Sequence, residues 1–258
     1  MNLYKGVIGC LLLLITLFFI GMEPVKRHDL FYLGLSGVLG ISLGDTFFFM
    51  ALINLGPRLM SLLGATTPVI VTVSAILFLG EKPTLLIILG ILLTIGGTIW
   101  VLQEETPQKQ AIKNKGRGIQ YGLLSILCMA AGVILTKVGV TSVPTLQATL
   151  IRLLGGVVGL LCWGYLTRVL KDWLIPFHNI ELFKQIFLVV VISTFGGFWL
   201  FVVALKYVDA AVASTLNSTT PLFILPMVAL MLKEKVSRQA CWGAVIVVGG
   251  IALIFMGS

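Results

Sequence analysis

Within the long apolar stretches of this sequence, few residues can do chemistry, and the most prominent of them is Asp45. It lies in the middle of the stretch LGISLGDTFFFMAL, with no cation near it in the sequence. A carboxyl group that is taken out of water favours its neutral form, so Asp45 is a candidate for binding and releasing a proton. The structural alternative is a hydrogen bond to a neighbouring helix.

Arg152 is the second charged residue inside an apolar stretch, about two turns from its start. Its planar guanidinium group could present a fork of donors to a carboxylate on a ligand. It could equally extend along its own helix and place its charge at the polar surface, as long basic side chains do. Both interpretations stay open at this point.

Glu81 and Glu234 each end an apolar stretch and are each followed by a lysine, Lys82 and Lys235. One interpretation is that these carboxylates make polar contacts at the ends of helices. The other is that they form a charge-paired gate. The gate hypothesis predicts that replacing Glu81 by glutamine changes the rate of whatever passes through the protein.

Two short motifs interrupt apolar stretches in the same way, LGATTP at 63–68 and LNSTTP at 216–221. A proline inside a helix removes one amide donor and frees a carbonyl one turn back, and neighbouring hydroxyl groups can partly compensate. The motifs therefore predict either simple kinks or interrupted helices that bind a ligand. The candidate residues are Thr66, Thr67, Pro68, Asn217, Thr219, Thr220 and Pro221.

Aromatic side chains accompany these polar residues. Three phenylalanines, at 47–49, follow Asp45, and Phe198, Trp199 and Phe201 take the equivalent place later in the chain. Packing between helices or exposure to lipid would explain most of them, and Trp199 is the best candidate for contact with a solute. A cavity lined by aromatic rings, threonine hydroxyls and one carboxylate would suit a small, partly apolar or zwitterionic solute.

The composition indicates whether these residues lie in a soluble protein or in a membrane protein. Of the 258 residues, 58% are hydrophobic and 11% are charged, and the mean hydropathy is +1.08. A soluble domain has about 25% charged residues, so this composition excludes a soluble fold and indicates an integral membrane protein. The 18 Lys and Arg exceed the 10 Asp and Glu, but they lie in short connections without interleaved aromatics, which argues against nucleic acid as a partner.

The apolar residues form nine runs of spanning or near-spanning length, since a helix needs about 20 residues to cross about 30 Å of hydrocarbon. The predicted runs are 3–21, 31–54, 59–79, 85–101, 119–137, 145–166, 182–206, 210–232 and 238–256. The connection at 102–118 is polar enough to be a linker between two halves. The sequence therefore predicts an all-α bundle with a first part at 1–101 and a second part at 119–256.

An internal repeat relates the two parts. A shift of 153 residues superimposes 44–101 on 197–254 without a gap, with identical residues at 16 of 58 positions, including Thr-Thr-Pro and Glu-Lys. The shift moves the second run onto the seventh, which is five crossings later. Because an odd shift reverses the direction of crossing, the sequence predicts repeats of inverted topology, a plan that is frequent among secondary transporters.

Each part has an Ala-Leu pair, a mid-helix proline, a helix-terminal glutamate and a following Gly-x5-Gly-Gly. This ordered set of motifs resembles the EamA-type family of the drug/metabolite transporter (DMT) superfamily. The resemblance covers nearly the whole chain. It implies a fold of ten helices in two inverted five-helix repeats, of which nine are visible here, because the first part has one run fewer than the second. Either the protein has nine helices or its start has been assigned downstream of the true one.

The resemblance also implies a function, a secondary transporter in the cell membrane that moves a small metabolite or drug-like solute such as an amino acid. We expect an exporter that is coupled to protons and works as a monomer, with no cofactor. A lipid-carrier flippase and a passive permease or channel of the same fold are the alternatives. An enzyme is not expected, because no constellation of nucleophile, base or metal ligands is present and the two histidines, His28 and His178, lie in or beside connections.

The orientation in the membrane has two conflicting indications. More Lys and Arg lie in the connections on the side of the N-terminus than on the other side, which predicts a cytoplasmic N-terminus and an external C-terminus. The family resemblance implies a cytoplasmic C-terminus instead.

Overall fold

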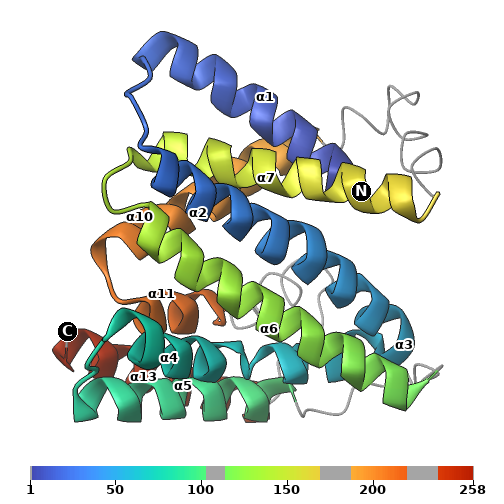
Figure 1. Ribbon diagram of the computed structural model, residues 1–258. Helices are drawn as coiled ribbons and strands as arrows, with labels where there is room; N and C mark the ends of the chain where they lie inside the picture. The colour runs from blue at the N-terminus through green and yellow to red at the C-terminus, as the bar shows by residue number, and fades with distance from the viewer. Residues whose placement is uncertain (1, 103–113, 169–186, 220–237, 258) are drawn as a thin grey trace. The chain divides into compact units, whose positions relative to one another are not determined.

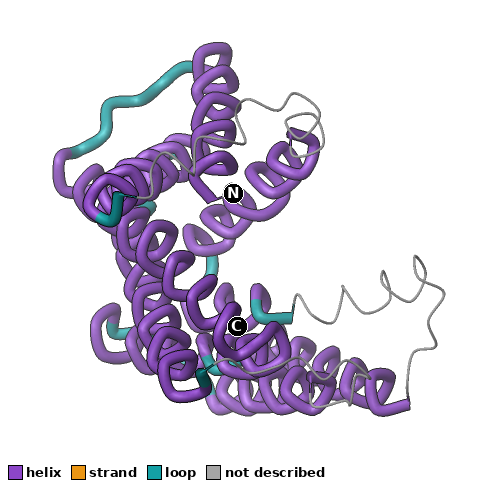
Figure 2. The backbone as a smooth tube through the Cα atoms, turned by 90° about the vertical axis from the view of Figure 1, so that its right-hand side faces the viewer, coloured by secondary structure: helices purple, strands orange, loops and turns teal. Residues whose placement is uncertain are grey.

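The computed structural model describes residues 2–102, 114–168, 187–219 and 238–257, and the regular structure within these ranges is entirely helical (Figure 2). The chain divides into two compact units. Unit 1 comprises Met1–Thr46 and Ala131–Val208, and unit 2 comprises Phe47–Ala130 and Asp209–Ser258. Each unit therefore combines a segment from the first part of the sequence with a segment from the second part.

Unit 1 is organised around α7 (Thr145–Leu166), against which α1 (Asn2–Ile20) and α2 (Arg27–Gly37) pack (Figure 1). The helix α2 continues through a π-helical segment, η1 (Val38–Gly44), which also contacts α7. A second π-helical segment, η3 (Ser193–Trp199), leads into α10 (Leu200–Tyr207). The boundaries between the units fall within two helices, α3 (Asp45–Gly64) and α6 (Lys115–Gly139), so each of these helices contributes residues to both units.

The contact between α2 and α7 depends on glycine. A Cβ atom on Gly37 would overlap the carbonyl oxygen of Arg152, and one on Gly155 would overlap the carbonyl oxygen of Gly34. The two backbones therefore approach as closely as small residues allow in membrane helices. Around this contact, buried apolar side chains of α1, η1 and α7 form one core cluster, which consists of Cys10, Leu13, Leu17, Ile41, Leu150 and Leu153.

Unit 2 contains α4 (Thr67–Leu79), α5 (Leu85–Leu102), α11 (Ala210–Asn217) and α13 (Arg238–Gly257), with most of α3 and α6. The helices α5 and α13 pack along each other, and α4 packs against α11. A Cβ atom on Gly90 would lie 2.6 Å from the carbonyl oxygen of Gly250, and one on Gly97 would lie 3.1 Å from that of Gly243. Small residues thus bring α5 and α13 into backbone contact.

The helix α3 contains a break at Gly56, whose φ of 78° lies in the left-handed region that favours glycine. Pro57 follows it and begins a new helical segment, a position where its missing amide hydrogen costs little. The break falls within the connection predicted at 55–58, so it separates the second apolar run from the third.

The described helices agree with most of the predicted runs, and α7 matches its run residue for residue. Among the described residues, six helical stretches are long and apolar enough to cross a membrane, and α5 and the end of α13 are shorter apolar helices. The eighth run is described only as far as α11 and the turn that follows it.

Two helices begin four residues earlier than their runs predicted. The fifth run was expected to begin at Ile119, but α6 begins at Lys115. The second run was expected to begin at Phe31, but α2 begins at Arg27. The polar residues His28 and Asp29 suggested a connection, whereas Asp29 is fully buried in the first turn of the helix. An acidic residue is stabilised in that position by the partial positive charge of a helix N-terminus.

Candidate functional site

Asp45 is the first residue of α3 and directly follows the π-helical segment η1. π-helical turns are rare and are frequently found at functional sites. The Asn2 side-chain amide, at the start of α1, donates a hydrogen bond of 2.9 Å to the Asp45 carboxylate. This contact agrees with the structural alternative given above, a hydrogen bond from a neighbouring helix.

Two cations interact electrostatically with Asp45, Lys5 from α1 and Arg152 from α7. Among the described residues, neither forms a salt bridge with it. Each cation lies instead over an aromatic ring. The Lys5 Nζ atom is 4.8 Å from the centroid of Phe198, and the Arg152 Cζ atom is 5.9 Å from that of Phe201. We refer to Asn2, Lys5, Asp45 and Arg152 as the charge cluster.

Arg152 lies inside unit 1, since only 7% of its surface is exposed. Its Nε and Nη1 atoms are buried and have no hydrogen-bond partner in the described part of the chain. The side chain therefore does not reach the surface in this conformation, contrary to the snorkelling interpretation. Buried N–H donors of a cation that lack acceptors are costly, because the protein does not replace the hydration that they have lost.

Trp199, the last residue of η3, contacts the same central helix. Its indole N–H donates a hydrogen bond of 3.1 Å to the hydroxyl oxygen of Thr145. The ring of Phe195 lies against it edge to face, with centroids 6.5 Å apart. The donor of Trp199 is thus engaged with α7.

The family assignment follows from comparison with known proteins. The model of the EamA-like transporter family matches residues 1–103 and 116–256. The chain belongs to the EamA-like transporter family. This confirms the resemblance inferred from the motifs and identifies a multi-pass membrane protein of the DMT superfamily, whose members are transporters and generally not enzymes.

A search of solved structures adds information about the fold alone. One crystal structure of a protein is 15% identical to this EamA-family chain, with a TM-score of 0.77, and the match covers 99% of this chain and 86% of the other. No curated protein matches the chain.

The Thr-Thr-Pro motifs of this EamA-family chain belong to unit 2 and form a separate feature. The helix α3 ends at Gly64, and α4 begins at Thr67, so Pro68 lies in a first helical turn rather than in the middle of a helix. The hydroxyl group of Thr66 donates a hydrogen bond of 2.7 Å to the carbonyl oxygen of Leu63. The third run is therefore interrupted at 65–66, just before Pro68, near which the interruption was predicted.

The second motif repeats this geometry as far as it is described. The helix α11 ends at Asn217, and the hydroxyl group of Thr219 donates a hydrogen bond of 2.7 Å to the carbonyl oxygen of Leu216. Thr220, Pro221 and Glu234 lie outside the described residues.

Glu81 follows α4 and contacts the start of α11. Its carboxylate accepts hydrogen bonds from the backbone N–H groups of Ala210 and Ala211, at 2.8 and 3.5 Å. A carboxylate at a helix N-terminus satisfies free donors and opposes the helix dipole. The geometry thus agrees with the interpretation of Glu81 as a helix-end contact, and a gate at this point stays a prediction.

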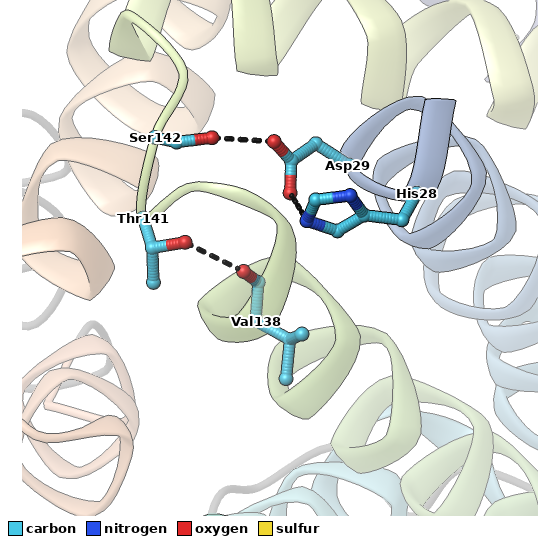
Figure 3. Close-up of polar contacts among 5 residues, drawn as sticks. All are labelled: His28, Asp29, Val138, Thr141 and Ser142. Carbon is cyan, nitrogen blue, oxygen red and sulfur yellow. Dashed lines mark hydrogen bonds and ion pairs between the residues drawn. The ribbon is translucent and has the colours of Figure 1, made fainter. Parts of the chain in front are cut away.

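One polar group was missed by sequence reasoning because it lies in a predicted connection. Asp29 accepts a hydrogen bond from Ser142, which lies between α6 and α7, and its other oxygen is 2.8 Å from His28 Nε2 (Figure 3). In the same connection, Val143 accepts a hydrogen bond of 2.9 Å from Lys206 at the end of α10. An acidic residue just after an N-cap position was the only sequence signal for this contact.

In the described part of this EamA-family chain, no group of three or more His, Cys, Asp or Glu side chains that could hold a metal ion is assembled.

Proposed function

We propose that this protein is a secondary transporter that exports a small metabolite or drug-like solute across the cytoplasmic membrane and couples this movement to protons. The observation that carries the proposal is the charge cluster of unit 1. It joins α1, the start of α3 and α7, all of which are parts of stretches that are long and apolar enough to cross a membrane. Ionisable residues at membrane depth are costly, and they commonly mark solute or proton pathways.

Asp45 is the group that we assign to proton coupling. Its side chain is partly exposed, and it has no salt-bridge partner among the described residues, so it can both gain and lose a proton. The substrate candidates in our proposal are Arg152 and Trp199 in unit 1, and Thr66, Thr67, Pro68, Asn217, Thr219, Thr220 and Pro221 in the two interrupted segments.

We further propose the inverted-repeat plan as the basis of the transport cycle. Its support in unit 2 is that the contacts recur at the 153-residue shift. The hydrogen bond from Thr66 to Leu63 has its counterpart in that from Thr219 to Leu216. The helix ends at Gly64 and Asn217 are also 153 residues apart. Random sequence similarity would not reproduce the same turn at the same register.

The packing of α5 on α13 supports the same plan. Gly90 approaches Gly250, and Gly97 approaches Gly243. The 153-residue shift converts Gly90 into Gly243 and Gly250 into Gly97, so it maps the first contact onto the second. A two-fold axis between the two helices would produce this pattern, because it maps every contact between them onto a second, equivalent contact.

The transport proposal is tested by counterflow in proteoliposomes that contain the purified full-length chain. Amino acids and aromatic cations are offered outside liposomes preloaded with the same solute, with and without a pH gradient. We expect at least one solute to accumulate transiently, since counterflow requires a carrier, and a pH gradient to increase this accumulation. Flux that only follows the solute gradient would indicate a channel and contradict the proposal.

The role of Asp45 is tested in the same liposomes. The variant Asp45→Asn should retain counterflow and lose the effect of the pH gradient. The matched control is Asp209→Asn, which removes the same charge from the residue before α11, where the side chain caps no donor. Undiminished pH-driven accumulation in a correctly inserted Asp45→Asn protein would exclude Asp45 from coupling.

A further inference from the structure

The guanidinium group of Arg152 lacks the partners that such a group ordinarily has in a protein interior. Buried arginines are normally paired with carboxylates that accept two parallel hydrogen bonds. Here the Nε and Nη1 donors have no acceptor, and the group lies over the ring of Phe201. The planar guanidinium group offers pairs of parallel N–H donors, and each pair fits the two oxygens of a single carboxylate.

The charges around Arg152 leave an excess of one positive charge. Lys5 and Arg152 carry two positive charges, and Asp45 supplies one negative charge that is already hydrogen bonded to Asn2. Among the described side chains, Lys5 and Arg152 are the charged groups that act on Asp45. A monovalent anion would make the charge cluster neutral, whereas an ammonium group would meet two like charges.

We propose that Arg152, assisted by Lys5, binds the carboxylate group of the transported solute, and that Asp45 is the resident counter-ion with which this carboxylate competes. This inference rests on the proposed transport function and specifies the chemical class of its substrate.

The body of the solute is expected to be apolar or aromatic. The rings of Phe198 and Phe201 lie against the two cations, and they present apolar surface beside the position of the carboxylate. Lys5 and Asp45 are only partly buried, whereas Arg152 is the buried member of the charge cluster.

The test is equilibrium binding to the full-length chain in lipid nanodiscs at fixed ionic strength, with three probes of one shape. Benzoate carries the carboxylate, benzamide is its neutral counterpart, and benzylamine carries a positive charge. We expect benzoate to bind at least about tenfold more tightly than either of the others, because charge-assisted hydrogen bonds to a buried guanidinium are the main attraction. Phenyl phosphate, offered as a dianion, should not bind more tightly than benzoate.

Three variants separate a binding role of Arg152 from a purely structural one. Arg152→Gln should weaken benzoate binding by about tenfold or more and leave the affinity for benzamide unchanged. Arg152→Lys should restore only part of the lost affinity for benzoate. Asp45→Asn should strengthen benzoate binding several-fold, because it removes the competing negative charge. The matched control is Lys26→Gln, which removes one positive charge from an exposed position in the same unit and should change nothing.

Asp45→Asn keeps the proposal testable even where the Arg152 variants fold poorly, since a structural role predicts no gain in affinity. Benzoate binding no tighter than that of benzamide, or weakened by Asp45→Asn, would overturn the proposal. Tighter binding of phenyl phosphate than of benzoate would also overturn the proposal, because the group recognised by Arg152 would then be a phosphate and not a carboxylate. These outcomes are independent of the counterflow result, so a carrier of cationic or neutral solutes would refute this inference and leave the transport function intact.

Discussion

Glu81 connects two helices through one side chain, because it follows α4 and accepts hydrogen bonds from the first N–H groups of α11. Removal of a capping acceptor costs about 1 kcal/mol, and loss of the charge alone costs about half of that. We therefore expect Glu81→Ala to lower the free energy of unfolding by about 1 kcal/mol and Glu81→Gln to lower it by less. If this contact closes the gate, both variants should also transport more slowly, since the closed arrangement is less populated.

The measurements for Glu81 are thermal unfolding of the purified protein and the initial rate of counterflow. Lys82→Gln is the matched control, because it changes the exposed neighbouring residue and leaves the cap in place. Normal transport by a stably folded Glu81→Gln protein would exclude the gate and leave Glu81 with a capping role only.

At the level of single residues, the sequence identified Asp45 and Arg152 but not their surroundings. Asp45 has no cation near it in the chain, and its partner Asn2 is separated from it by 43 positions. Such neighbours depend on how α1 and α7 pack, which periodicity and composition do not encode. Asp29 was missed for a different reason, since polar residues in a first helical turn resemble those of a connection.

At the level of helices, hydropathy predicted most of the elements well. The reason is physical, since a segment in lipid must satisfy its backbone groups internally and therefore forms a helix along its apolar length. The interruption at 65–66 was predicted near Pro68 because proline disrupts the interior of a helix, but Pro68 lies in the first turn of α4, where it is tolerated. The π-helical segments η1 and η3 were not predicted, because an apolar run shows where a helix lies and not how many residues form each of its turns.

The close packing of α5 on α13 gives a sharp prediction at the same scale. A Cβ atom on Gly250 would lie 2.8 Å from the carbonyl oxygen of Gly90 and 2.8 Å from the backbone nitrogen of Thr94, whereas one on Gly249 would meet nothing within 4 Å. We expect Gly250→Ala to destabilise the protein by about 1–3 kcal/mol through overpacking. Gly249→Ala should be neutral or slightly stabilising, because alanine is the better helix former.

These two alanine variants differ only in the helix face that they alter. Thermal unfolding of the purified proteins in one detergent compares them directly. Equal stabilities would mean that α5 and α13 do not pack through Gly250, and the two-fold argument drawn from this contact would lose its support.

At the level of the whole molecule, each compact unit combines segments from both halves of the sequence, as the boundaries at Thr46 and Val208 show. The 153-residue shift moves 47–101 of unit 2 onto 200–254, most of which also belongs to unit 2. The units are therefore not the repeats. Each unit combines a segment with most of its equivalent at the 153-residue shift, which is the division that the proposed repeats predict.

Inverted repeats make a prediction about the two sides of the membrane. Lys82 and Lys235 are equivalent at the 153-residue shift and are separated by five predicted crossings, so they should lie on opposite sides. We replace Cys10, Cys128, Cys162 and Cys241 by alanine and introduce one cysteine at a time as Lys82→Cys or Lys235→Cys. From the distribution of basic residues, we expect a membrane-impermeant maleimide to label Lys82→Cys in intact cells and Lys235→Cys only after permeabilisation.

The same labelling separates orientation from inversion. A cysteine at Asn114, in the polar connection between the two halves, should react from the side of Lys235→Cys, because the predicted crossings place both there. If all three cysteines are labelled from the side opposite to the predicted one, the orientation is reversed and the inverted plan is kept. That result would agree with the cytoplasmic C-terminus that the family resemblance implies. Labelling of Lys82→Cys and Lys235→Cys from one side would exclude inversion, because an odd number of crossings cannot return the chain to the side from which it started.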